Sequence, residues 1–194
     1  MSTLTQLPFH WMNQSDIVLQ GDHAQMTAPP KSDFFCDPRG LISNDNAPYY
    51  YTEASGDFVF RARVRPQFLA TYDSCTLMVM DGPTTWAKVC FEFTDFGTHA
   101  VVSVVTNGVS DDANGPNIAE DTVWLQIARR DNLFAFHYSL DGQRYDMVRI
   151  FSLPVNDPVK VGLVAQSPTG EGAVMEFFDV SLEARTVDNL RAGK

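Results

Sequence analysis

The stretch Trp86 to Asn107, WAKVCFEFTDFGTHAVVSVVTN, holds two runs of strand-forming residues around a single turn signal. Aromatic and β-branched side chains dominate both runs, which is typical of paired β-strands. A four-residue turn at Asp95 to Thr98 pairs Thr94 with His99. This register predicts one apolar face made of Val89, Phe91, Phe93, Ala100, Val102 and Val104. The opposite face then carries Trp86, Lys88, Cys90, Glu92, Val101, Ser103, Val105 and Asn107.

A second hairpin follows farther along the chain. A turn at Asp131-Asn132 pairs Arg130 with Leu133. Its apolar face comprises Val123, Leu125, Ile127, Phe134, Phe136 and Tyr138, with Arg129 at the end, and its other face comprises Trp124, Gln126, Ala128, His137 and Ser139. Because alternate strand residues point to opposite sides, both apolar faces are expected to lie between two sheets.

The remainder of the chain continues the same pattern of short strands and turns. Further strands are expected at Phe58 to Arg65, Thr76 to Asp81, Tyr145 to Phe151, Val159 to Gln166 and Ala173 to Leu182, with weaker ones at Ile17 to Leu19, Ala24 to Thr27 and Leu41 to Ser43. Many short strands at this spacing predict an all-β fold, a two-sheet sandwich or a barrel. We expect a single domain over residues 1–184, a long loop from Thr106 to Thr122, and a frayed C-terminal tail over residues 185–194.

Composition narrows the class of protein and of partner. The 194 residues include 14 Lys+Arg and 24 Asp+Glu, a net charge of −10, which disfavours nucleic acid and anionic membranes as partners. No apolar run reaches the length of a membrane span, and none resembling a secretory signal precedes Lys31. The three cysteines, Cys36, Cys75 and Cys90, form neither a disulfide framework nor a metal motif, so a reducing cytoplasm is the expected compartment.

The polar faces of the two hairpins supply the candidate binding site. A Trp ring stacks on the apolar side of a sugar, and planar polar groups pair with sugar hydroxyls. The predicted ligand-binding residues are Trp86, Lys88, Glu92, Asn107, Trp124, Gln126 and His137, with a saccharide or small metabolite as the partner. The alternative interpretation is that each of them is an ordinary solvated strand residue.

The sequence gives weaker evidence for catalytic residues and for cofactors than for a binding site. A glycosidase needs two carboxylates about 5 to 10 Å apart, and the strand of Glu92 offers no second one on the same face. No catalytic residue is therefore assigned, although a sugar-active enzyme that uses Glu92, Lys88 and His137 remains an alternative, as does a protein-interaction module. No metal or other cofactor is assigned either.

An acidic segment and a row of three arginines each have a structural and a functional interpretation. Ser110, Asp112, Asn114, Gly115 and Asp121 fit a calcium-loop template only in part, so a solvated acidic loop is favoured over a calcium site. Arg61, Arg63 and Arg65 alternate on one strand and share a face. We expect ion pairs with the acidic loops of the protein there, rather than a solvent-exposed face or a clamp for an anionic ligand.

Several segments together resemble a known family. They are Met26 to Pro29, Ser32 to Phe35, Tyr72 to Val79, Trp86 to Phe93, Val101 to Asn107, Ser110-Asp111, Trp124 to Ile127 and Tyr138 to Gly142. In this order and spacing, over roughly residues 9–183, they resemble an uncharacterised concanavalin A-like family that includes the fungal "regulation of enolase" proteins. The resemblance implies a two-sheet jelly roll with a curved sheet, related in fold to lectins, glucanases and accessory modules of xylosidases. The family pattern has Trp where this chain has Phe35 and Asp112, and usually Gly where it has Cys90.

Overall fold

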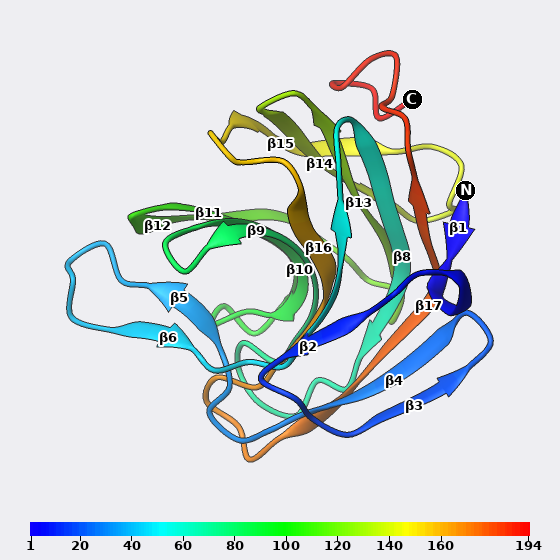
Figure 1. The fold of residues 1–194 in the computed structure, drawn as a ribbon. Coiled ribbons are helices and arrows are strands. Elements are labelled where there is room, and N and C mark those ends of the chain that lie inside the picture. The colour runs from blue at the N-terminus through cyan, green and yellow to red at the C-terminus, as the bar shows by residue number, and fades with distance from the viewer.

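Two antiparallel β-sheets pack face to face in the computed structural model, which describes residues 1–194 (Figure 1). The predicted two-sheet all-β fold is therefore confirmed. The eight-stranded sheet runs, from one edge to the other, β15 (Asp146–Ser152), β14 (Leu133–Ser139), β13 (Val123–Arg130), β8 (Phe58–Pro66), β17 (Ala173–Glu183), β4 (His23–Ala28) and β3 (Ile17–Gln20), and β1 (Ser2–Thr3) pairs with β17. The seven-stranded sheet runs β12 (Val109–Asn117), β11 (His99–Asn107), β10 (Thr85–Phe93), β9 (Ser74–Gly82), β16 (Val159–Gln166), β7 (Tyr49–Ala54) and β2 (His10–Met12).

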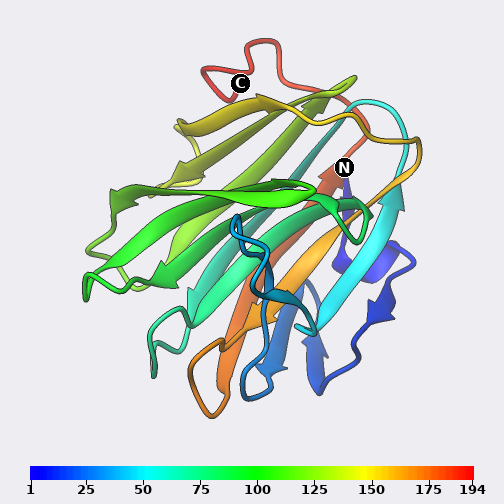
Figure 2. The same ribbon diagram turned by 90° about the vertical axis from the view of Figure 1, so that its left-hand side faces the viewer.

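A small third layer lies outside the seven-stranded sheet. Strands β5 (Phe34–Cys36) and β6 (Ser43–Asp45) form a separate hairpin, which projects at the left of Figure 1 and crosses in front of that sheet in Figure 2. The one helical element is the 3-10 turn η1 (Leu4–Gln6), so no helix is long enough to span a membrane.

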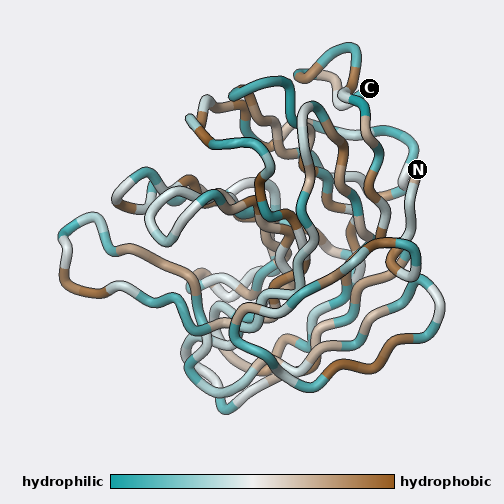
Figure 3. Tube along the Cα trace, viewed as in Figure 1, coloured by the Kyte–Doolittle hydropathy of each residue, from teal (hydrophilic) through white to brown (hydrophobic).

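The main core lies between the sheets, where hydrophobic segments of the strands face one another (Figure 3). Phe60, Leu125, Phe136 and Phe177 project from the eight-stranded sheet, and Leu77, Phe91, Val101 and Leu163 project from the seven-stranded one. Burying each such side chain contributes about 1.5–3 kcal/mol relative to exposure. The interior is thus filled with hydrocarbon, and polar strand residues have to face outward.

The second predicted hairpin is confirmed. Arg130 pairs with Leu133, Ile127 with Phe136 and Gln126 with His137. The apolar residues of β13 and β14 enter the core, and Trp124, Gln126 and His137 lie on the outer face of the eight-stranded sheet.

The first hairpin has the predicted strands but a different register. Phe93 pairs with His99, one residue away from the predicted partner, because the loop contains three residues, Asp95 to Gly97, instead of four. Gly97 adopts a left-handed conformation, with φ of 72°, which suits a three-residue loop ending in a bulge. Since a shift of one residue exchanges the faces of a strand, every residue of β11 lies on the face opposite to the predicted one. Val101 points into the core, whereas Ala100, Val102, Val104 and Thr106 share the outer face with Lys88.

The predicted loop from Thr106 to Thr122 is wrong. The chain reverses at Asn107-Gly108, with Gly108 at φ of 83°, and β12 then pairs with β11 as an edge strand. Asn107 is exposed at this turn opposite Thr85, so it does not join the polar face of β10. Ser110, Asp112 and Asn114 lie on an extended strand, which contradicts the calcium-loop template.

The C-terminal tail is packed and not frayed. Val187 and Leu190 cover Val59, Ala128 and Ala135 on the outer face of the eight-stranded sheet. Apolar residues in the tail and on the sheet are buried together, which explains the order of a segment that has no strand pattern.

A candidate binding cavity on the seven-stranded sheet

A cavity of about 530 Å³ lies on the outer face of the seven-stranded sheet, and we call it the cavity from here on. Lys88 and Glu92 from β10 and Asp112 and Asn114 from β12 form its base. The other lining residues come from the β5 region, the loops and the neighbouring strands: Asp33, Phe35, Tyr72, Asp95, Phe96, Val102, Val104, Gln166 and Pro168. Segments far apart in the sequence thus meet at one site.

Lys88 is held at the base of the cavity by a polar network. Its side chain is buried, and its Nζ donates hydrogen bonds to the Phe34 carbonyl oxygen at 2.7 Å and to Gln166 Oε1 at 3.1 Å. Asp33 Oδ1 lies 3.4 Å from the same Nζ and accepts a bond from Gln166 Nε2 at 3.0 Å. Burial is the largest influence on Lys88 and acts to lower its pKa, but the charges of Asp33, Cys90 and Glu92 and the hydrogen bond to Asp33 together outweigh burial, and the pKa is raised. Lys88 is therefore a fixed cation.

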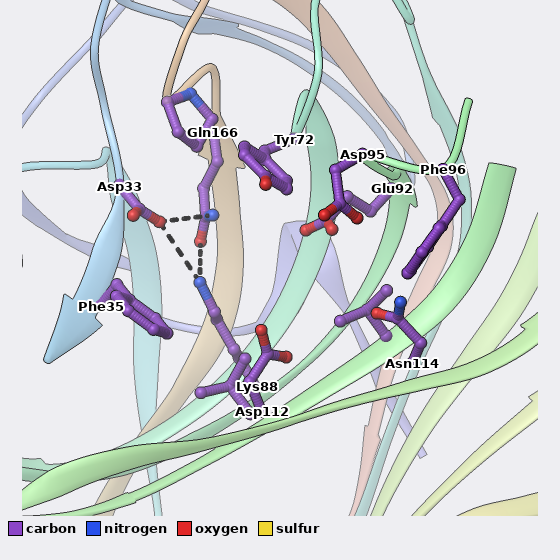
Figure 4. Close-up of a pocket in the computed structure, with 13 residues that line it drawn as sticks. Asp33, Phe35, Tyr72, Lys88, Glu92, Asp95, Phe96, Asp112, Asn114 and Gln166 are labelled. Atoms are coloured by element: carbon purple, nitrogen blue, oxygen red, sulfur yellow. Dashed lines mark hydrogen bonds and ion pairs between the residues drawn. The ribbon is translucent and has the colours of Figure 1, made fainter. Parts of the chain in front are cut away.

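Glu92 is the carboxyl group without such support. Figure 4 shows no hydrogen bond or ion pair between the Glu92 side chain and the other residues that line the cavity. Burial raises its pKa to about 8, and the carboxylates of Asp112, Asp33 and Asp95 add to the effect while Lys88 opposes it. A carboxylic acid that stays protonated near neutral pH is able to donate a hydrogen bond to a ligand.

Burial and nearby carboxylates also raise the pKa values of two neighbouring side chains. Burial raises the pKa of Asp112, and burial together with nearby carboxylates raises the pKa of Tyr72. Tyr72 has a left-handed backbone, with φ of 72°, and its amide donates to the Phe93 carbonyl oxygen at 2.6 Å. Strained conformations of non-glycine residues concentrate at ligand sites. These perturbed groups share one concave surface, which is a physical sign of a functional site.

Aromatic rings complete the cavity. Figure 4 shows Phe35 and Phe96 on opposite sides, with Tyr72, Glu92 and Asp112 between them. Phe96 is 76% exposed at the tip of the β10–β11 loop, so its ring is available to a ligand. The arrangement offers two apolar ring faces around polar groups, and the face of a sugar ring suits such surfaces.

Trp86, predicted as the stacking residue, lies beneath this site. It is 1% exposed and packs against Phe34, with ring centroids 6.2 Å apart, while its indole N–H donates to the Pro83 carbonyl oxygen. The β5 strand covers it together with Tyr49, Met78 and Met80 in a second small core. Direct stacking of a ligand on Trp86 is therefore contradicted by its burial.

Three of the predicted residues, Trp124, Gln126 and His137, lie on the other outer face of the sandwich. His137 Nε2 donates to the Leu190 carbonyl oxygen at 2.6 Å, and its Nδ1 lies 3.0 Å from Gln126 Nε2. Gln126 also accepts from Arg61, and both residues are buried under the C-terminal tail. Trp124 packs against Gly142, where an added Cβ would lie 2.8 Å from the indole.

The predicted single site of seven residues is thus wrong as a cluster. Lys88 and Glu92 lie together in the cavity, Trp86 lies below them, Asn107 is at a turn, and Trp124, Gln126 and His137 are on the opposite sheet. Lys88 forms its ion pair with Asp33 and not with Glu92, its neighbour on the same face of β10.

Several cavity residues were present in recognisable segments but had no assigned role. Asp33 and Phe35 belong to the Ser32 to Phe35 segment, and Tyr72 opens another. Asp112 and Asn114 were hidden by the missed Asn107-Gly108 turn, a strong hairpin signal that would have placed them on a strand beside β11. Asp95, Phe96 and Gln166 carried no sequence signal that separated them from ordinary turn and strand residues.

Comparisons with known proteins agree with the fold. A sequence profile described as a protein of unknown function (DUF1349) matches residues 11–185. The "Regulation of enolase protein 1" of Saccharomyces cerevisiae is 26% identical over 178 residues, which cover 90% of this chain and 88% of that protein. The predicted resemblance is confirmed by both findings.

Solved structures extend the likeness. A crystal structure of a functionally unknown protein from Saccharomyces cerevisiae superposes with a TM-score of 0.88 at 24% identity, covering 96% of this chain and 100% of that one. The metal-free lectin I-B4 of Griffonia simplicifolia superposes with a TM-score of 0.57 at 10% identity, covering 90% of this chain and 92% of the lectin. Both likenesses concern the β-sandwich fold.

Proposed function

The chain belongs to the DUF1349 family of proteins of unknown function, and we propose that it binds a saccharide or small polar metabolite in the cavity without catalysing its conversion. The observation that carries the proposal is the cavity itself. Its volume of about 530 Å³ lies within the usual range for small-molecule sites. It joins apolar rings, fixed polar groups and perturbed carboxyls in one concave surface.

The chemistry of the lining supports a polyhydroxylated ligand. Gln166, Asn114 and Tyr72 present amide and hydroxyl groups, and the carboxyls accept bonds from hydroxyl donors. Phe35 and Phe96 supply surfaces for the apolar side of a ring. The lectin that shares the fold adds support for a saccharide over other polar ligands.

The cytoplasm remains the proposed compartment. The three cysteines are free and buried, which suits a reducing environment.

A sugar-active enzyme is the second candidate, and Glu92 is the observation that favours it. A protonated carboxyl with a pKa of about 8 is suited to act as a general acid near neutral pH. The original trio of Glu92, Lys88 and His137 is not available, because His137 lies on the other sheet and Lys88 is fixed by its network. Turnover of a bound sugar that is lost in Glu92→Gln would favour the enzyme over the binding protein.

The binding proposal is tested by ligand titration of paired aromatic variants. A panel of mono- and disaccharides is screened by the rise in melting temperature, since a ligand that binds only the folded state stabilises it. Phe35→Ala is expected to weaken the strongest hit about tenfold, as loss of about 1.4 kcal/mol of stacking predicts. Trp124→Ala, an aromatic truncation on the other outer face, is the matched control and should leave affinity unchanged. Equal affinities of Phe35→Ala and the unaltered protein would contradict binding in the cavity.

A further inference from the structure

The charges around the cavity are unequal. Four carboxyl groups line it, those of Asp33, Glu92, Asp95 and Asp112, against the single ammonium group of Lys88. Asp33 lies 3.4 Å from that ammonium and balances it. Glu92, Asp95 and Asp112 are left without a cation from the lining.

No basic side chain outside the lining replaces the missing charge. The guanidinium of Arg149 also acts on Asp112, but its Nη2 pairs with the Asp111 carboxylate at 3.1 Å and its Nη1 donates to the Asp111 carbonyl oxygen. Lys88 itself already donates to the Phe34 carbonyl oxygen and to Gln166. The lining therefore has spare acceptors and no spare cation.

Glu92 is an unpartnered carboxyl group in this surface. It stands on β10 between Lys88 and the Asp95 turn, and its carboxyl points into the cavity without a protein hydrogen bond (Figure 4). Burying a carboxyl without a partner costs free energy, which a ligand donor would recover on binding. An ammonium group recovers more than a hydroxyl because its positive charge also stabilises the ionised form of this carboxyl, which is largely protonated near neutral pH before a ligand binds.

The aromatic residues favour the same kind of ligand. Phe35 and Phe96 lie on either side of the carboxyls, and a ring face attracts cations as well as the apolar side of a sugar. An anionic sugar would meet like charges at this surface, which disfavours binding.

From this geometry we propose that the cavity selects a cationic saccharide, an amino sugar whose ammonium group lies among Glu92, Asp95 and Asp112 while its ring contacts Phe35 and Phe96. The inference rests on the proposed binding function and specifies the charge of its ligand. Arg61, Arg63 and Arg65 do not supply cations to the cavity, because they lie on the other sheet and pair with acidic residues of β17.

Three sugars that differ only at carbon 6 test the inference: 6-amino-6-deoxyglucose, glucose and glucuronate. Each is titrated into the full chain at pH 7.5 and constant ionic strength, and amide chemical shifts give the dissociation constants. We expect 6-amino-6-deoxyglucose to bind at least tenfold more tightly than glucuronate, with glucose between them. Asp112→Asn and Glu92→Gln should each reduce this ratio several-fold. Asp179→Asn, on the outer face of the eight-stranded sheet, is the matched control and should preserve it.

The outcomes separate the inference from the function on which it rests. If all three sugars shift cavity amides with equal affinity, the charge preference is wrong and the saccharide site stands. Tighter binding of glucuronate also overturns the preference. If none of the three shifts cavity amides, the inference fails together with the proposed function. A ratio that survives both Asp112→Asn and Glu92→Gln shows that the carboxyls do not recognise the amine.

Discussion

The two outer faces of the sandwich carry similar polar and aromatic residues, but only one face supplies its polar side chains with partners inside the protein. On the eight-stranded sheet, Gln126 and His137 bond to each other and to their neighbours, and the C-terminal tail covers them. On the seven-stranded sheet, Glu92 has no partner, and the β5–β6 hairpin covers Trp86 but leaves the cavity beside it. The first arrangement satisfies its polar groups within the protein, whereas the second leaves them for a ligand.

This difference shows why a polar strand face does not identify a site by itself. Both hairpins place a Trp and several polar residues on one side of a strand, and alternation cannot distinguish them. What separates the two faces is whether another segment satisfies the polar groups. That segment is distant in sequence in both cases, since residues 185–194 cover β13 and β14, and residues 34–36 lie over β10.

The largest effect is expected from removal of the C-terminal tail that covers the eight-stranded sheet. Deletion of residues 185–194 would expose Val59, Ala128 and Ala135 and remove the carbonyl partner of His137. We expect the free energy of unfolding in urea to fall by about 3–5 kcal/mol, from lost apolar burial and lost hydrogen bonds. Sugar binding in the cavity should be unaffected under native conditions. An unchanged unfolding midpoint would mean that the tail is not part of the folded unit.

Replacing Glu92 by a neutral residue tests the uncovered face, where a carboxyl without a partner is expected to reduce the stability of the folded protein. The folded pKa of about 8 exceeds the usual 4.5, so the folded protein holds this proton while the unfolded chain releases it. Stability from this group is therefore complete below pH 4.5 and is lost as the pH rises through 8. Glu92→Gln should be more stable than the unaltered protein by about 1–3 kcal/mol at pH 9, a range reduced from the full shift because the side chain is partly exposed.

Chemical denaturation at pH 4 and pH 9 measures this effect. The two proteins should have similar stability at pH 4 and diverge at pH 9. A variant that is less stable than the unaltered protein at pH 9 would show that Glu92 has a partner in solution, and the contrast between the two faces would then disappear.

Local signals predicted most of the fold. The strands of both hairpins and the register of the second follow from alternation and from turn residues such as Asp131-Asn132. The first register failed because Phe96-Gly97 is compatible with loops of three or four residues, and only the left-handed Gly97 decides between them. A single-residue error there reversed the faces of β11.

The candidate site was predicted only in part, for a different physical reason. Lys88 and Glu92 were identified because they share a strand face, which is local information. Asp33, Phe35 and Gln166 reach the same cavity through tertiary packing, which periodicity does not encode. His137 and Trp124 showed the same local pattern as Lys88, and only the position of β13 in the other sheet separates them from it.

His137 provides a pH test of the covered face. Burial lowers its pKa below the usual 6.5, and the charge of Arg61 contributes, although the bond to Leu190 opposes the shift. The unfolded chain therefore binds a proton at a higher pH than the folded one. Stability from this group is complete above pH 6.5 and is lost as the pH falls through the folded pKa.

We expect the unaltered protein to lose about 1 kcal/mol more than His137→Gln between pH 7 and pH 5, because one differential proton contributes up to about 1.4 kcal/mol per pH unit. Gln retains a donor for the Leu190 carbonyl oxygen but does not titrate. Urea unfolding at the two pH values measures the difference. Parallel losses in both proteins would assign the acid sensitivity to other groups.

The smallest expected effect concerns the exposed part of the covered face. Arg61, Arg63 and Arg65 form ion pairs within the protein as predicted, but their partners are Glu183, Asp179 and Glu176 of the neighbouring strand β17 and not the acidic loops. Arg63 and Asp179 are both exposed, so Arg63→Gln should cost less than about 0.5 kcal/mol. Arg61→Gln is the informative comparison, since Arg61 pairs with a largely buried Glu183 and also bonds to Gln126. We expect it to cost about 1–2 kcal/mol, because its buried partners would lose a charged donor. Equal costs in urea unfolding would show that solvent, and not the network under the tail, determines the stability of this face.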